Sequence, residues 1–145
     1  MGKGHGGYTE IKAYYVDSKN QKVIDKGTIF VAERYIDMGY ESVFRGRRND
    51  KSLDLTIKTS DDTQFVKNIE VKMVSSDKAS QISTQIERAR SQIKDGDTVA
   101  IYLPNFINDS RGLEHAKTGI DEARRKGYIK GPIEVWFSDK TKVNF

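Results

Sequence analysis

Hydrophobic and polar side chains alternate along two neighbouring stretches of the chain, residues 53–57 and 68–74. A period of two is typical of a strand that buries one face. Residues 60–63, Ser-Asp-Asp-Thr, separate the two stretches and have the composition of a turn. The pattern therefore predicts a β-hairpin with an apolar face and a polar face. Because strand side chains alternate, three charged residues can meet on the polar face: Asp54, Glu70 and Lys72.

Two carboxylates and an ammonium group suit metal-assisted chemistry on phosphate esters. Carboxylate oxygens are ligands for Mg²⁺ and Mn²⁺, and such an ion lowers the pKa of bound water and offsets phosphoryl charge. A nearby lysine can orient the water or stabilise developing charge. The alternative is a solvated hairpin face with an ordinary cross-strand ion pair, and short motifs alone do not decide between the two.

The rest of the chain predicts helices and strands in alternation. Apolar positions at helical spacing mark helices over 28–38 and 79–94, and a third helix that begins near Asp109 or Ser110. Glycines at 39 and 127 mark the ends of the first and third helices. Further strands are predicted over residues 40–44, 98–103 and 133–137; the continuous apolar run at 98–103 predicts a strand buried on both faces.

The element order predicts an α/β fold, αβββαβαβ, with a mixed central sheet flanked by helices. We expect one domain over residues 25–145, preceded by a polar, glycine-rich lead-in over residues 1–24. Within that lead-in, residues 8–24 are expected to be irregular or helical.

Glu33 is a further candidate because apolar residues border it within the first helix. Ile29 lies about one turn before it and Ile36 about one turn after it. A carboxylate at the edge of a core is costly unless something compensates it. A structural salt bridge, for example to Lys72, and a role as metal ligand or water-positioning group are both open.

Composition excludes several other kinds of site. The chain has 145 residues, 36% hydrophobic and 32% charged, with no cysteine and two histidines, His5 and His115. Disulfides and thiolate zinc sites are therefore impossible, and a histidine metal cage or serine–histidine triad is disfavoured. His115, beside an apolar stripe, is expected to be structural. No apolar run approaches the ~20 residues of a membrane-spanning helix.

The net charge is +4, with a pI near 9.2, which permits a polyanionic partner. Arg47 and Arg48 lie in a basic stretch, residues 45–51, just before the first hairpin strand. Phosphate contact and simple solvation are both open for them. Gln85 and Arg88 lie on the helix after the second hairpin strand. They could reach a phosphate, or form an ordinary polar flank.

This order, with these residues, resembles the PD-(D/E)xK nuclease superfamily. There, a helix carries a glutamate, and the adjoining hairpin carries an acid and an (E/D)xK triplet. The resemblance covers residues 28–103 and places the helix glutamate at Glu33, the strand acid at Asp54 and the triplet at Glu70-Val71-Lys72. It implies a restriction-endonuclease-like fold and Mg²⁺- or Mn²⁺-dependent phosphodiester hydrolysis. Leu53 stands where the motif has proline.

Within the superfamily, the chain looks most like the C-terminal toxin domains of contact-dependent growth inhibition proteins and related bacterial toxins. That resemblance implies cleavage of tRNA in the bacterial cytoplasm, delivery as part of a larger secreted or cell-surface protein, and a cognate immunity protein. Two alternatives remain: a structure-specific DNA nuclease resembling Holliday junction resolvases, and a non-catalytic nucleic-acid-binding module on the same fold.

Overall fold

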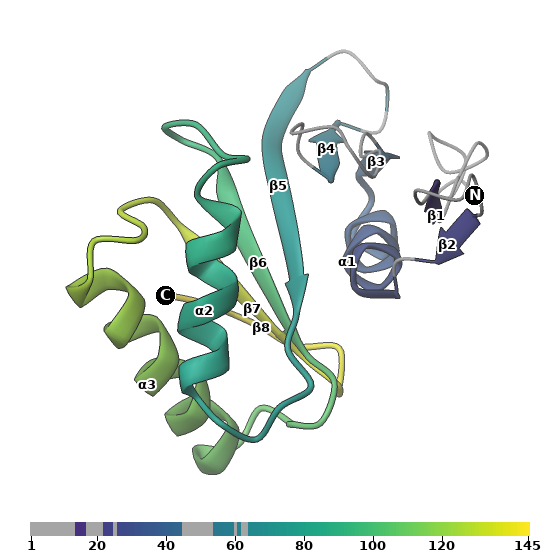
Figure 1. Ribbon diagram of the computed structural model, residues 1–145. Helices are drawn as coiled ribbons and strands as arrows, with labels where there is room; N and C mark the ends of the chain where they lie inside the picture. Colours follow the sequence, from purple (N-terminus) through teal and green to yellow (C-terminus); the bar gives the residue numbers. More distant parts are fainter. Residues whose placement is uncertain (1–13, 17–21, 25, 45–53, 60, 62–63) are drawn as a thin grey trace. The chain divides into compact units, whose positions relative to one another are not determined.

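A computed structural model of the chain describes residues 14–16, 22–24, 26–44, 54–59, 61 and 64–145. Its residues group into two units, 1–70 and 71–145, and the boundary falls inside strand β5. The elements are, in chain order, β1 (Tyr14–Val16), β2 (Lys22–Ile24), α1 (Lys26–Asp37), β3 (Glu41–Phe44), β4 (Leu55–Lys58), β5 (Phe65–Met73), α2 (Ser80–Ala89), β6 (Thr98–Leu103), α3 (Ser110–Arg125), β7 (Ile133–Phe137) and β8 (Lys142–Asn144) (Figure 1).

From α1 to β7 the elements follow the predicted order, and the α/β class with a mixed sheet is confirmed. The prediction for residues 8–24 was wrong where the structure describes them. There, β1 and β2 pair as a two-stranded antiparallel sheet, with Tyr15 opposite Val23. The short strand β8, antiparallel to β7, was not predicted.

The main sheet is open and has six strands in the order β3-β4-β5-β6-β7-β8. In the first unit β3, β4 and β5 pair antiparallel. In the second unit β6 and β7 are parallel. Helix α3 makes the crossover that parallel neighbours need.

Helix α1 packs on β3 and β4 of the first unit. Its buried face includes Val31, Ala32 and Tyr35, and the Ser42 hydroxyl of β3 donates to the Ala32 carbonyl at 3.0 Å. As predicted, Gly39 follows the end of this helix. Its φ of +96° suits a residue without a Cβ.

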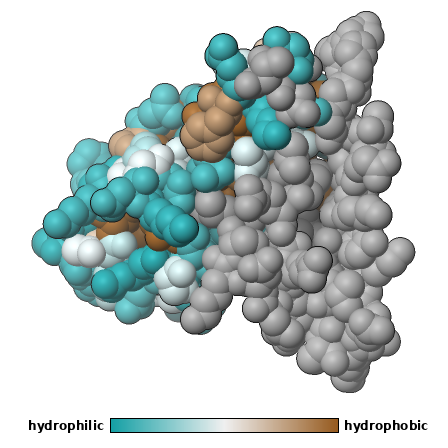
Figure 2. Space-filling view, turned by 90° about the horizontal axis from the view of Figure 1, so that it is seen from above, coloured by the Kyte–Doolittle hydropathy of each residue, from teal (hydrophilic) through white to brown (hydrophobic). Residues whose placement is uncertain are grey.

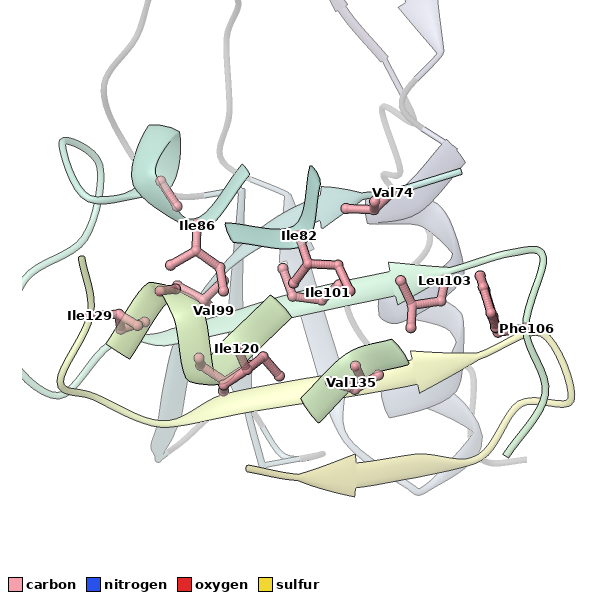
Figure 3. Packing of buried hydrophobic residues seen from close by; sticks show 14 of the residues in the cluster. Val74, Ile82, Ile86, Val99, Ile101, Leu103, Phe106, Ile120, Ile129 and Val135 are labelled. Carbon is pink, nitrogen blue, oxygen red and sulfur yellow. The ribbon is translucent and has the colours of Figure 1, made fainter. Parts of the chain in front are cut away.

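The core of the second unit lies between the two helices α2 and α3 and one face of β6 and β7. Figure 3 shows Ile82 and Ile86 of α2 and Ile120 of α3 packed with Ile101 and Val135 of the strands. Each of these side chains is at most 1% exposed. Burial of one such side chain contributes about 1.5–3 kcal/mol. This stripe packing is what the helical spacing in the sequence predicts.

Helices α2 and α3 run in the same direction and approach closely at Gly119. A Cβ at Gly119 would lie 2.5 Å from the Ala79 carbonyl oxygen and 2.6 Å from the Ile82 Cβ. Just past the ends of both helices, the Arg90 guanidinium lies 5.4 Å from the Tyr128 ring centroid. The hydrogen of a glycine is therefore what lets the two backbones meet here.

The ends of α2 and α3 agree with the sequence to different degrees. Asp109 caps α3 as predicted, and its side chain accepts from the Gly112 amide at 2.8 Å. Helix α2 was predicted to reach residue 94 but ends at Ala89. The amides of Arg90 and Gln92 bond three residues back, at 3.3 and 2.9 Å, so the last α-helical turn tightens and the helix stops.

Hydrophilic residues cover most of the described surface in Figure 2, with small hydrophobic areas between them. Among the described residues, no helix combines the length and apolar composition needed to cross a membrane.

His115 is a buried part of this core, 8% exposed, as the sequence predicted. Its ring stacks on Phe106 with the centroids 4.0 Å apart. Burial lowers the pKa of His115, and the Arg111 guanidinium lowers it further; Asp77 and a hydrogen bond to the Ser76 backbone act in the opposite direction.

We expect the free energy of unfolding to fall as the pH drops below about 6.5, the ordinary pKa of histidine. The unfolded chain then binds a proton that folded His115, with its lowered pKa, does not. One proton of difference gives a slope of at most about 1.4 kcal/mol per pH unit. Urea unfolding between pH 5.5 and 7.5 measures this slope.

The variant His115→Gln removes the titrating group and should flatten the slope in that window. His5→Gln, which changes the other histidine, is the control for the loss of a histidine elsewhere in the chain. Equal slopes in the wild type and His115→Gln would contradict this account.

Candidate functional site

The register of β4 and β5 bears on two of the predicted acids, Asp54 and Glu70. Leu55 pairs with Ile69 and Thr56 pairs with Asn68. Continued by one step past the Leu55–Ile69 pair, this antiparallel ladder would set Asp54, the residue before β4, opposite Glu70. Side chains directly opposite in such a ladder have Cβ atoms about 4.5–5.5 Å apart.

The two faces of this hairpin differ in chemistry as the sequence predicted. Leu55, Ile57 and Ile69 are fully buried on one face. On the other face the Thr56 hydroxyl donates to the Asn68 side-chain oxygen at 2.8 Å. Asp54 and Glu70 share this second face by strand alternation.

Glu70 is 1% exposed although it carries a carboxylate. Taking an ionised carboxylate out of water costs several kcal/mol unless a cation, a proton or hydrogen bonds compensate. Asp54 is half-buried. A second acid at position 54 would add to the cost of burying the Glu70 carboxylate, because like charges directly opposite are unfavourable. This combination is suited to binding a cation.

Lys72 follows Glu70 by two residues in β5, so both side chains leave the same side of the strand. Lys72 is partly buried. Its ammonium lies 3.5 Å from the side-chain oxygen of Gln92, just beyond α2. Its contact with Gln92 is a structural role that the sequence did not predict.

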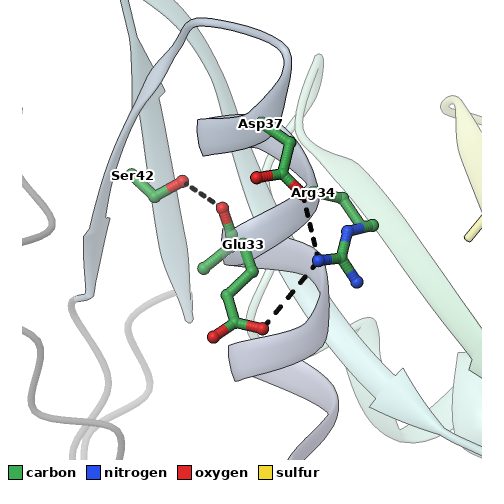
Figure 4. A network of polar contacts seen from close by, with 5 residues as sticks. Glu33, Arg34, Asp37 and Ser42 are labelled. Carbon is green, nitrogen blue, oxygen red and sulfur yellow. Dashed lines mark hydrogen bonds and ion pairs between the residues drawn. The ribbon is translucent and has the colours of Figure 1, made fainter. Parts of the chain in front are cut away.

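Glu33 lies on α1, and this helix packs against the apolar face of the hairpin. The evidence is a hydrogen bond from Lys67, on the same face as Ile69, to the Tyr35 hydroxyl of α1 at 3.2 Å. The Glu33 side chain is 44% exposed and 4.0 Å from the Arg34 guanidinium. Arg34 also bonds Asp37 at 3.1 Å (Figure 4). Glu33 is therefore more exposed than the sequence suggested, and the structure does not group it with Asp54 and Glu70.

The donor set that remains is small. Within the described part of the chain, no three residues among His, Cys, Asp and Glu come close enough to hold a metal ion. Mg²⁺ is commonly bound by only one or two carboxylates, with water and substrate phosphate as the other ligands. Asp54 and Glu70 therefore fit such an ion as a two-carboxylate site.

The candidate nucleic-acid contacts are only partly described. Gln85 is half-buried and Arg88 is exposed, both on α2 of the second unit. Arg47 and Arg48 lie outside the described residues. For all four, phosphate binding stays a prediction.

Two polar contacts were missed from the sequence. The first is the bond between Thr56 and Asn68; strand alternation was a usable signal, because it puts both residues on the face of Asp54. The second involves Glu134 of β7, 2% exposed, which accepts from the Trp136 indole at 3.1 Å and lies 3.9 Å from the Lys142 ammonium. These partners give Glu134 a structural role.

Comparisons of the chain with known protein families, with curated proteins and with solved structures gave no match.

The pairing of Asp54 with Glu70 can be tested by cross-linking, because the chain has no cysteine. In Asp54→Cys/Glu70→Cys, we expect a disulfide to form readily under mild oxidation, since opposite positions lie within disulfide range. Mass spectrometry of the oxidised protein would detect it.

The matched control is Asp54→Cys/Asn68→Cys, which uses the same face but a diagonal pair about 7–8 Å apart. It should cross-link more slowly. Faster cross-linking in the control would contradict the register at Asp54.

Proposed function

We propose that this chain is a divalent-metal-dependent endonuclease that hydrolyses phosphodiester bonds of nucleic acid. The observation that carries the proposal is the register of β4 and β5, which leads to Asp54 opposite Glu70 on one polar face. The burial of Glu70 supports it, since a bound cation would compensate a buried carboxylate.

The residues have distinct roles in this proposal. Asp54 and Glu70 would hold Mg²⁺ or Mn²⁺ together with the backbone carbonyl of Val71. The bound ion would supply a water of lowered pKa and offset charge on the phosphate. Lys72 would orient the attacking water and stabilise the charge that develops on the phosphoryl oxygens. Glu33 receives no role at this ion in the proposal, because α1 packs against the opposite face of the hairpin.

The finer assignment rests on sequence resemblance: a bacterial toxin domain that cleaves tRNA, acts in the cytoplasm of a target cell and is inhibited by an immunity protein. The net charge of +4 is compatible with a nucleic-acid substrate. Incubation with total tRNA and with plasmid DNA, each with Mg²⁺, Mn²⁺ or EDTA, separates this assignment from a DNA nuclease. Binding without metal-dependent cleavage would favour a non-catalytic module.

Isosteric neutralisation of the two acids tests the proposed site. We expect Asp54→Asn and Glu70→Gln to reduce cleavage to the level of EDTA-treated wild type, because each removes a charged metal ligand. Mn²⁺ should raise the melting temperature of the wild type, since an ion that binds only the folded state stabilises it. It should raise that of the two variants much less.

Glu114→Gln, an exposed glutamate on α3, is the control and should cleave and respond to Mn²⁺ like the wild type. Wild-type cleavage in either Asp54→Asn or Glu70→Gln would refute the assignment of these ligands.

Lys72→Met tests the lysine against a purely structural role. If Lys72 stabilises the transition state, single-turnover cleavage should fall about 10²–10³-fold, while Mn²⁺ binding persists. If Lys72 only holds Gln92, the variant Gln92→Ala should lower cleavage as much as Lys72→Met. We expect Gln92→Ala to retain most of the activity, and equal losses would remove Lys72 from the mechanism.

A further inference from the structure

The polar face of the hairpin carries two further side chains beside the acids, Thr56 and Asn68. The pair lies one register step from Asp54 and Glu70. Thr56 is 4% exposed, so its hydroxyl needs a hydrogen-bond partner. The Asn68 side-chain oxygen is that partner, at 2.8 Å.

This bond orients the amide of Asn68. Because the Asn68 oxygen accepts from Thr56 across the ladder, the amide nitrogen on the other arm of the planar group points away from Thr56. That nitrogen carries two N–H donors. It therefore presents donors to whichever neighbours on this face can accept.

Among the described side chains of β4 and β5 that lie beside Asn68 on this face, the acids Asp54 and Glu70 can accept. Toward the turn, the nearest positions are Lys58 and the bulge residue Val66; lysine has no acceptor, and valine is apolar. Toward the other end lie Glu70, two residues along the same strand, and Asp54, diagonally across. Ionised carboxylates are acceptor-only groups.

We propose that Asn68 is a positioning residue that donates an amide N–H to the Asp54–Glu70 carboxylate pair, with Thr56 fixing the orientation of the amide. This inference rests on the proposed function, because it treats the two acids as metal ligands. Hydrogen bonds to ligating carboxylates orient them and are typically worth about 10–100-fold in metal affinity or activity. The donor also offsets repulsion between two like charges.

Calorimetric titration with Mn²⁺ tests the two residues together. Asn68→Ala should weaken Mn²⁺ binding about 10–100-fold. Thr56→Val should weaken it less, and Thr56→Ser, which keeps the hydroxyl, should recover most of that loss. If Thr56 acts through Asn68, the double variant Thr56→Val/Asn68→Ala should bind no more weakly than Asn68→Ala alone, because coupled residues are not additive.

Thr59→Val is the matched control. It also removes a threonine hydroxyl from this hairpin, one that donates to Asp61 at 2.6 Å, but it leaves Asn68 untouched. It should lower stability without changing Mn²⁺ affinity. Mn²⁺ affinity in Asn68→Ala within about threefold of the wild type, well short of the expected loss, would overturn the inference.

A metal-free measurement separates failure of this inference from failure of the proposed function. In the NMR spectrum of the metal-free wild type, the Asn68 side-chain amide should exchange slowly with solvent, and Glu70→Gln or Thr56→Val should accelerate that exchange. If the wild type neither binds Mn²⁺ nor cleaves, the proposed function fails, and slow exchange that depends on Glu70 still supports the hydrogen bond. If the Asn68 side-chain amide of the wild type exchanges as fast as that of Thr56→Val, the hydrogen bond from Asn68 to the acids is refuted.

Discussion

The antiparallel pairing of β4 with β5 is the constraint on which the candidate site depends. Strand side chains alternate, so a slip of one residue would send the polar side chains to the buried face. Leu55, Ile57 and Ile69 are fully buried on that face, at about 1.5–3 kcal/mol each. The bond between Thr56 and Asn68 is worth only about 0.5–1.5 kcal/mol. The apolar face therefore fixes the register, and the polar face takes its geometry from it.

An irregularity in the same hairpin lies at the opposite end from the acids. After Ile57 pairs with Lys67, Lys58 pairs with Phe65, which leaves Val66 as an extra residue. Such a bulge bends a strand and changes the direction of side chains, and Phe65 is 62% exposed. From Lys67 to Ile69 the ladder is regular, so the bulge lies away from the end of the ladder next to which Asp54 and Glu70 stand.

Periodic stretches were predictable from the sequence, and short or register-dependent features were not. The hairpin and the helices α1, α2 and α3 each repeat a pattern over several residues, and their order was predicted. β8 has three residues, too few to show a period, and the end of α2 at Ala89 depends on local backbone bonds.

Strand alternation put Asp54 and Glu70 on one polar face. It could not show that Thr56 bonds Asn68, because a cross-strand contact also needs the register. For Glu33, helical spacing identified the apolar neighbours but not the nearby Arg34 guanidinium.

The two most buried glutamates of the described chain differ in what surrounds them. Around Glu134 are an indole N–H and, at 3.9 Å, an ammonium group, both suited to compensate a carboxylate. On the face of Glu70, the ladder of β4 and β5, continued by one step, would set a second acid opposite. A fold selected for stability alone would avoid like charges at such a position, because their repulsion adds to the desolvation cost. A bound cation would offset that cost, and this is why the Asp54–Glu70 pair carries the functional proposal.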